Sequence, residues 1–416
     1  MNFIDLFSGA GGLSEGFIRE GFNAIAHVEM DKASCNTLLT RTAYHYLVKI
    51  GHKEIYIDYL KNKIGRDELY GLLPDEFKKS VINEPIGAQN NDKIFERIDA
   101  LKKSKQIDLI VGGPPCQAYS LIGRAADKNG MKDDDRNYLY IQYAEFLKKY
   151  KPKAFVFENV LGLLSAKDNN GERYLDKMLK LFREIGYETE YQLLHANDFG
   201  VLQKRKRVIL IGKKGTEKGF YPKFKKKDIS KINVEEIFKG LPKLQAGKGN
   251  FFETKYTNDF SEYLKEIKVQ NGLDFTTQHI ARPHNTQDKE IYRIAINKWN
   301  KKGERLNYND LPDRLKSHKN RSSFTDRFKI VAEELPACHT VVAHIAKDGH
   351  YYIHPDIKQN RSITPREAAR LQSFPDDYFF EGQSLKPSRT AAFKQIGNAV
   401  PPLMAEEIAK EIKKLL

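Results

Sequence analysis

The sequence predicts an α/β fold, a doubly wound, mixed and mostly parallel sheet with a smaller second domain. From residue 3 to about 212, short apolar runs alternate with stretches of helical periodicity. Strands that are almost wholly apolar and separated by helices are typical of a parallel sheet covered on both faces. After Gly212 the alternation stops and a lysine-rich region without a sustained period begins. We therefore expect a large domain of residues 1–212, with a second domain after it.

Each element follows from local periodicity and from the residues that start and stop helices. Apolar runs predict strands at residues 3–7, 23–29, 107–113, 153–159, 189–194 and 207–212. Amphipathic stretches predict helices at 35–50, 137–150 and 173–186. A charge-rich insertion, residues 53–105, is placed at the periphery of the sheet. Thr364 and Pro365 predict the start of a short helix, and residues 401–416 predict a last one.

Composition excludes several classes of protein. No apolar run among the 416 residues approaches the roughly 20 residues of a membrane span, and the N-terminus does not resemble a signal peptide. We therefore expect a cytoplasmic protein. Three cysteines without CxxC spacing argue against a disulfide framework and against structural zinc. One cysteine and irregularly spaced histidines between residues 338 and 354 likewise predict no metal site.

The positive charge is unevenly distributed. The net charge is +15, and residues 213–337 hold 27 Lys and Arg against 17 Asp and Glu. Such clustering is typical of a surface that follows nucleic-acid phosphates, because each neutralised phosphate releases counterions. A solvated face of a lysine-rich protein is the alternative.

A glycine turn follows the first predicted strand. Gly9, Gly11 and Gly12 stand between that strand and a helix, where glycine lets the backbone approach a ligand. Glu29 ends the next strand 20 residues after Gly9, where a carboxylate accepts hydrogen bonds from ribose hydroxyls. The pattern indicates a nucleoside-containing cofactor. Because Ser14 replaces the third glycine of the usual fingerprint, a plain tight turn with a surface glutamate is the alternative.

Cys116 is the candidate nucleophile. It follows an apolar strand and two prolines, at the sheet edge where open α/β folds bind ligands. Its polar, glycine-rich neighbours predict an accessible loop, which a nucleophilic thiol needs. Cys35 and Cys338 are interpreted as buried structural cysteines.

Candidate partners for the thiol come from later strands. Glu158 and Asn159 end another apolar strand, so Glu158 is expected on the same sheet edge as Cys116. Gln203, Arg205 and Arg207 come before the apolar run of residues 208–212. A solvated basic turn is the alternative for this last group.

Six segments, in order through nearly the whole chain, resemble the motifs of the DNA cytosine C5-methyltransferase family, of the bacterial restriction-modification type. The segments are FSGAGG, GGPPCQAYS, FENV, QKRKR, RSITPREAARLQSFPDDY and QIGNAVPP. The resemblance implies a DNA (cytosine-5-)-methyltransferase that uses S-adenosylmethionine, yields S-adenosylhomocysteine and modifies a specific cytosine in double-stranded DNA.

The resemblance also implies catalytic roles that the chemistry supports. Cytosine is a weak nucleophile at C5, and attack of the Cys116 thiolate on C6 supplies the missing electron density. Glu158 would hold the N3 and exocyclic amine edge of the base. Arg205 and Arg207 would contact the base carbonyl and a neighbouring phosphate, and Arg207 would also favour the thiolate. The base that removes the C5 proton is left unassigned.

Cofactor contacts carry over position by position. Phe7 would stack on adenine, Glu29 would bind ribose and Asn398 would support the methionine moiety. The segment that carries Asn398 would thereby complete the large domain, so the resemblance implies a large domain of residues 1–212 plus 391–416 and a small domain of residues 213–390. Met30 stands where the family often has an aromatic residue. The adenine-contacting acidic residue is expected to be Glu84, near Ile86, or Asp92. The full set assigned to the cofactor by resemblance is Phe7, Ser8, Gly9, Gly11, Gly12, Glu29, Met30, Pro114 and Asn398.

DNA recognition is expected to involve a flipped base, because C5 and C6 are inaccessible to an enzyme inside a duplex. The loop after Cys116 is long enough to close over the extruded base. Residues 213–337 would form the target-recognition region. We expect a bacterial, nucleoid-associated monomer on DNA, with a restriction endonuclease as a possible functional partner. The residues assigned to the loop and to DNA are Gln117, Ser120, Arg124 and Gln203.

Three alternatives come from other classes. An RNA (tRNA) cytosine C5-methyltransferase would share the catalytic motifs, but the long basic region favours duplex DNA. A catalytically silent DNA-binding homologue should lack Cys116 or Glu158, and both are present. A nicotinamide oxidoreductase would explain the glycine turn but neither the thiol nor the glutamate.

Overall fold

The protein is built around a seven-stranded sheet in the order β3-β2-β1-β4-β5-β7-β6. The computed structural model describes residues 1–115, 138–318, 321–322 and 325–416. Strand β7 is antiparallel to both of its neighbours, and β3, β2, β1, β4 and β5 are mutually parallel. The predicted mixed, mostly parallel sheet is confirmed. The strands are β1 (Asn2–Leu6), β2 (Asn23–Glu29), β3 (Val81–Asn83), β4 (Leu109–Gly112), β5 (Ala154–Asn159), β6 (Tyr187–His195) and β7 (Lys206–Lys214).

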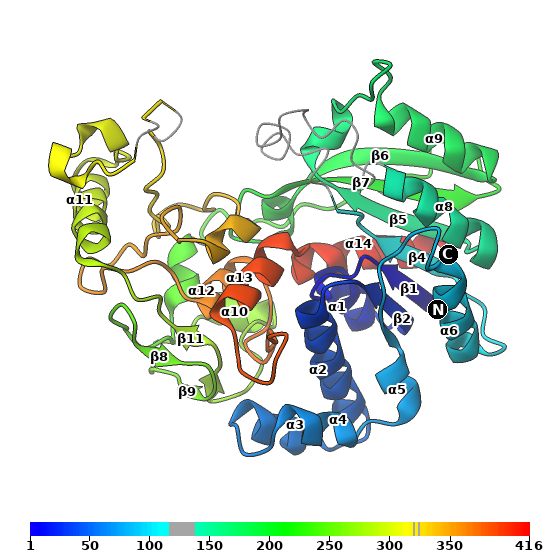
Figure 1. The fold of residues 1–416 in the computed structure, drawn as a ribbon, viewed down its shortest axis with the longest axis horizontal. Helices are drawn as coiled ribbons and strands as arrows, with labels where there is room; N and C mark the ends of the chain where they lie inside the picture. Colours follow the sequence, from blue (N-terminus) through cyan, green and yellow to red (C-terminus); the bar gives the residue numbers. More distant parts are fainter. Residues whose placement is uncertain (116–137, 319–320, 323–324) are drawn as a thin grey trace.

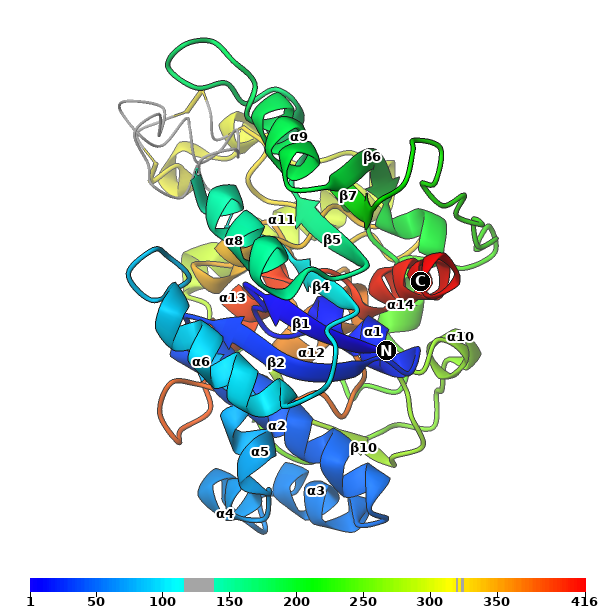
Figure 2. The ribbon, with the colours of Figure 1, turned by 90° about the vertical axis from the view of Figure 1, so that its right-hand side faces the viewer.

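Helices cover both faces of the sheet (Figure 2). Alternate strand residues point to opposite faces, so Phe3 packs on one side and Ile4 on the other. The core on the side of Phe3 includes α1 and α14, whereas the core on the side of Ile4 includes α6, α8 and α9. These helices are α1 (Gly12–Arg19), α6 (Asn91–Lys102), α8 (Leu139–Tyr150), α9 (Tyr174–Glu184) and α14 (Pro402–Leu415), and α2 (Lys32–Lys49) follows β2.

The charge-rich insertion is only partly peripheral. Helices α3 (Lys53–Leu60), α4 (Arg66–Gly71) and α5 (Asp75–Lys79) lie beyond the sheet, around the end of α2 (Figure 1). The same insertion also supplies the edge strand β3 and helix α6, which packs on β2. Strand β3 escaped prediction because three residues are too few to show a period.

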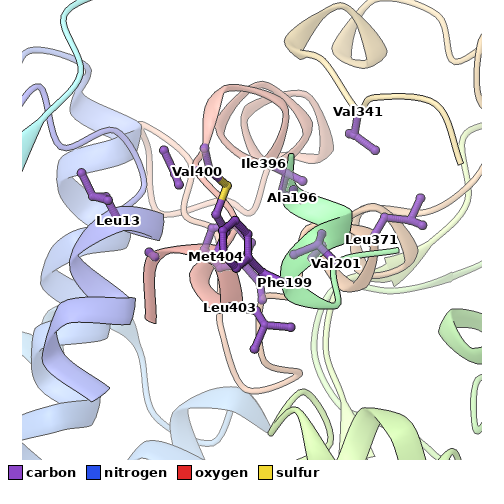
Figure 3. Close-up of a cluster of buried hydrophobic side chains, with 14 of the residues drawn as sticks. Leu13, Ala196, Phe199, Val201, Val341, Leu371, Ile396, Val400, Leu403 and Met404 are labelled. Atoms are coloured by element: carbon purple, nitrogen blue, oxygen red, sulfur yellow. The ribbon is translucent and has the colours of Figure 1, made fainter. Parts of the chain in front are cut away.

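The C-terminal segment returns to the large domain. Helix α12 (Pro365–Leu371) begins with the expected cap, because Thr364 and Glu367 form a reciprocal capping box. Helix α13 (Arg389–Asn398) follows. Figure 3 shows side chains of α1, α12, α13 and α14, among them Leu13, Leu371, Ile396 and Met404, pointing into one cluster. Residues from Ile363 onward thus contribute to the same core as α1. The division into residues 1–212 plus 391–416 and residues 213–390 remains a proposal.

A separate, smaller core surrounds α11 (Thr286–Lys302), which stands apart from the sheet in Figure 1. Residues near 234–280 form short elements between the two cores: α10 (Glu262–Glu266) and the antiparallel pairs β8 (Gly249–Asn250) with β11 (His279–Ile280) and β9 (Thr254–Lys255) with β10 (Phe275–Thr276). In the described ranges, no helix combines the length and the apolar character that crossing a membrane requires.

Candidate active site

The strand order changes direction between β1 and β4, which lie side by side. Connections leave these two strands toward opposite halves of the sheet, and folds of this type bind their ligands outside the carboxyl ends of two such strands. The glycine turn follows β1, the Gly113–Pro114 segment follows β4, and Glu158 lies near the end of β5. Because these strands are parallel, all three groups lie at one edge of the sheet, as predicted for Glu158 and the segment that leads to Cys116.

The glycine turn has an unusual backbone. Phe7, Gly9 and Gly11 all have positive φ, at 56°, 53° and 80°. Positive φ is uncommon for a residue such as Phe7 and tends to occur at functional sites. A Cβ atom on Gly9 would meet no atom within 4 Å, whereas one on Gly12 would lie 2.2 Å from the Val400 carbonyl oxygen. Gly9 therefore borders open space, and Gly12 is required for packing against the start of α14.

Glu29 is joined to the turn by its carboxylate. The Gly9 and Asp31 N–H groups each donate to one carboxylate oxygen, at 2.8 Å. Burial raises the pKa of Glu29 and outweighs these two backbone hydrogen bonds. Each oxygen keeps a lone pair for a further donor. Met30 follows with 66% of its side chain exposed, so an apolar surface lies next to the carboxylate.

The two candidates for the adenine contact are in different places. Glu84 directly follows β3, and the β3 residue before it, Asn83, is the register partner of Glu29. Glu84 also forms an ion pair with Lys93. Asp92 is exposed in the first turn of α6. The structure therefore places Glu84 at the same sheet edge as Glu29, which favours it over Asp92.

Glu158 forms an ion pair with Arg207. The Arg207 Nε and Glu158 Oε1 atoms are 2.5 Å apart, and the two side chains are 12% and 14% exposed. The antiparallel register explains the contact, because Ile209 lies opposite Glu158 and Arg207 is two residues away on the same face. A carboxylate and a guanidinium are therefore held together, mostly out of water, at the ligand-binding edge.

The backbone at Gly113 packs directly against this carboxylate. A Cβ atom on Gly113 would lie 2.5 Å from Glu158 Oε2 and 3.1 Å from the Glu158 carbonyl oxygen. Next along the chain, the Asn159 amide donates to the Pro114 carbonyl at 3.4 Å. The β5 end thus fixes the path of the segment that leads to Cys116.

Substituting Gly113 by alanine should displace the Glu158 carboxylate. We expect Gly113→Ala to lower turnover by about 10-fold or more, since small misplacements of a catalytic group cost this much. Gly71→Ala is the control, because a Cβ atom there meets no atom within 4 Å. Initial rates of methyl transfer would measure both, and equal rates for the two variants would contradict a close Gly113–Glu158 contact.

Gln203 and Arg205 correct the sequence-based assignments. Gln203 was predicted to contact DNA, but its side chain is fully buried and bonded to Leu371, Gln372 and Val341. Arg205 was expected to contact the base, but its guanidinium is also fully buried and donates to the carbonyls of Val341, Gly397 and Asn398. Both side chains tie the QKRKR segment to the returning C-terminal segment. The carbonyl of Asn398, an exposed residue that ends α13, is thus one of the groups that Arg205 holds.

Cys116, Gln117, Ser120 and Arg124 lie outside the described residues. The other two cysteines are buried, and burial raises the pKa of each thiol to about 12. Cys35 and Cys338 are therefore protonated at neutral pH and weakly nucleophilic.

Sequence reasoning missed a polar group beneath the turn. Asp5, in the middle of β1, is bonded to Ser14, and Ser14 lies 3.2 Å from the His27 ring nitrogen. All three side chains are buried. The available signal was a carboxylate in an otherwise apolar strand, which is costly unless it is bonded.

The sheet and its edge define a doubly wound α/β enzyme, with a glycine turn and a carboxylate at one strand and a buried carboxylate–guanidinium pair beside the other. Among known families, the model described as C-5 cytosine-specific DNA methylase matches residues 1–68 and 79–414. The chain therefore belongs to the C-5 cytosine-specific DNA methylase family, a family of S-adenosylmethionine-dependent methyltransferases, and is a DNA (cytosine-5-)-methyltransferase.

Individual relatives agree with the family assignment. The chain is 41% identical to the type II methyltransferase M.Bpa9945I of Bacillus paralicheniformis, over 100% of this chain and 99% of that protein. It is 30% identical to the type II methyltransferase M.DdeI of Desulfomicrobium norvegicum, over 99% of this chain and 88% of that protein. The solved structure of a protein encoded within an Escherichia coli prophage has the same fold, with a TM-score of 0.62, 24% identity, and 100% and 99% of the two chains covered.

Proposed function

We propose that this protein transfers a methyl group from S-adenosylmethionine to C5 of a specific cytosine in double-stranded DNA. In the proposal, Cys116 is the nucleophile and the target base is rotated out of the duplex. The observation that carries it is the Glu158–Arg207 pair, which lies against the backbone of Gly113, three residues before Cys116. A ring held at this edge could meet the thiol and the carboxylate together.

The first step adds the thiolate to the pyrimidine ring. The Cys116 sulfur forms a bond to C6, and the electrons of the C5–C6 double bond move toward C4 and N3. In this step Glu158 carries a proton taken up from solvent; it gives that proton to N3 and accepts a hydrogen bond from the exocyclic amine, so negative charge does not accumulate on the ring. Arg207 holds Glu158 in place and stabilises charge in a mostly water-excluded setting.

The residues at the neighbouring strand end fit the cofactor. Gly9 borders open space, the Glu29 carboxylate has lone pairs left for the ribose hydroxyls, and Met30 offers an exposed apolar surface to adenine. Glu84 is assigned to the adenine amine because it directly follows β3, the strand that pairs with β2. When bound, S-adenosylmethionine supplies an electrophilic methyl carbon. S-Adenosylmethionine held there would supply that carbon to C5 and leave as S-adenosylhomocysteine. A base then removes the C5 proton, the electrons re-form the C5–C6 double bond and expel the Cys116 thiolate, and N3 returns its proton to Glu158.

The target-recognition region is proposed to lie within 213–337, but its first lysines face elsewhere. Lys213 is the register partner of Ala154, which begins β5, whereas Val208 is opposite Asn159, which ends it. Lys213 and Lys214 therefore lie at the edge of the sheet away from Glu158. The α11 core and the segments beside it are the part of this region that we assign to base reading, with phosphate contacts that set its position on DNA.

The relatives are named type II methyltransferases. On that basis we propose that the methylated site is also the recognition site of a restriction endonuclease in the same cell. Growth of a host that expresses this endonuclease should depend on the methyltransferase.

An assay with tritiated S-adenosylmethionine tests the proposal against its main alternative. We expect transfer to duplex DNA to exceed transfer to tRNA, with the label recovered as 5-methylcytosine. Faster labelling of tRNA would favour the RNA methyltransferase instead. Sequencing of methylated cytosines in a host that lacks them would then identify the target.

A further inference from the structure

We propose that Tyr378 is a positioning residue for the cofactor, because it fixes the peptide planes of the glycine turn; this inference rests on the proposed function. Tyr378 follows α12 in the returning C-terminal segment, 368 residues from the turn that it contacts. Its hydroxyl donates to the Ala10 carbonyl at 2.6 Å, and its side chain is 1% exposed.

The hydrogen bond from Tyr378 holds one end of a peptide unit whose other end is also held. The Ala10 carbonyl and the Gly11 N–H belong to the same peptide, and the Gly11 N–H donates to the Ser8 carbonyl at 2.9 Å. Ala10 is 2% exposed, so without Tyr378 its carbonyl would lack a partner where water is excluded. A Cβ atom on Gly11 would lie 3.0 Å from the Tyr378 hydroxyl, which shows how closely the two segments approach.

The same pattern continues to Glu29. The Ser8 carbonyl and the Gly9 N–H belong to one peptide unit, which lies two units before that of Ala10 and Gly11, and the Gly9 N–H donates to Glu29 Oε2 at 2.8 Å. Two peptide units, joined by the hydrogen bond from Gly11 to Ser8, therefore connect Tyr378 to the carboxylate that we assign to ribose. Hydrogen bonds in such a chain polarise and strengthen one another. Loss of the Tyr378 hydroxyl should thus weaken the hydrogen bond that orients the Glu29 carboxylate.

Tyr378 is itself held rigidly. Its ring packs against those of Phe374 and Phe380, with centroids 4.8 and 5.2 Å away. The Arg41 guanidinium lies 4.8 Å from its ring centroid on another side. Arg41 is fixed in turn by ion pairs with Glu15 at 2.6 Å and Asp377 at 3.0 Å. The hydroxyl thus has a defined direction before any cofactor binds.

The test compares two tyrosine-to-phenylalanine variants of the full chain. Tyr378→Phe removes the hydrogen bond to the turn. Tyr187→Phe is the matched control, because Tyr187 is also 1% exposed and donates to a main-chain carbonyl, that of Pro152, at 2.8 Å. Loss of a hydrogen bond to a buried carbonyl should weaken S-adenosylmethionine binding by about 5- to 50-fold in Tyr378→Phe alone.

Calorimetric titration with S-adenosylmethionine and steady-state kinetics give the readouts. We expect Tyr378→Phe to raise Kd and KM for S-adenosylmethionine with kcat and the Kd for duplex DNA within about twofold of wild type, whereas Tyr187→Phe changes neither KM nor kcat. Unchanged binding in Tyr378→Phe, or equal weakening in both variants, would overturn the positioning role. Wild-type protein that does not bind S-adenosylmethionine would instead contradict the proposed function.

Discussion

Replacement of Cys116 by alanine is expected to lower methyl transfer by a factor on the order of 10³ or more while duplex DNA still binds. Without the sulfur, C5 receives no electron density from C6 and remains too weak a nucleophile. The segment that leads to Cys116 is fixed by Gly113 and by the Pro114 carbonyl, so it should keep its path in the variant. Radiolabel incorporation and a gel-shift titration measure the two quantities.

Cys338→Ala is the matched control for this experiment. Cys338 is fully buried, and burial raises the pKa of its thiol to about 12, so no thiolate is lost at neutral pH. Turnover per folded molecule should remain close to wild type. If Cys116→Ala kept substantial turnover and Cys338→Ala lost it, Cys116 could not be the nucleophile.

Glu158→Gln should slow transfer by about 10²- to 10⁴-fold, the usual range for loss of a general acid–base group. Glutamine keeps the size of the side chain but cannot give a proton to N3. The substitution also removes the negative partner of Arg207, whose side chain is only 12% exposed. DNA affinity should change only a few-fold, so the loss should fall on kcat rather than on binding.

Glu188→Gln provides the comparison for Glu158. Glu188 lies on β6 of the same sheet and forms an ion pair with Arg183 at 3.2 Å. Glu188 is near the start of β6, at the edge of the sheet away from Glu158. Its substitution removes the same charge and should leave kcat unchanged. Similar rates for Glu158→Gln and wild type would leave Glu158 without a catalytic role.

The large-scale fold was predictable because it depends on local periodicity. Apolar runs separated by amphipathic helices specify a buried sheet, and its parallel strands bring Gly9, Glu29, Gly113 and Glu158 to one edge by geometry alone. Strand β3 was missed because it has only three residues. The ion pairs of the returning segment gave no local signal, because their charged residues are buried: Asp376 pairs with Arg370 at 2.5 Å, and Asp377 pairs with Arg41.

Two side chains of the QKRKR segment were misassigned for a related reason. Five polar residues in a row indicate a solvated turn, yet Gln203 and Arg205 are buried while Lys204 and Lys206 are exposed. Burial thus alternates with period two, which is typical of extended backbone, although the sequence is polar throughout. Partners such as Val341 and Gly397 lie far along the chain, so local patterns could not show what satisfies a buried guanidinium.

The contact between Tyr378 and the glycine turn was beyond sequence reasoning altogether. Nothing local to residues 372–380 distinguishes a tyrosine that fills a core from one whose hydroxyl holds a remote carbonyl. Only the packing of the returning segment against α1 and α2 reveals it.

Covalent trapping on modified DNA tests the central claim most directly. Fluorine at C5 of the target cytosine cannot leave as a cation, so after attack at C6 and methyl transfer the enzyme should remain bonded to the base. With a duplex that contains 5-fluorocytosine at the mapped site, we predict a denaturation-resistant complex that requires S-adenosylmethionine, and mass spectrometry should locate the crosslink at Cys116. A crosslink at another residue, or none under conditions where the unmodified duplex is methylated, would contradict the mechanism.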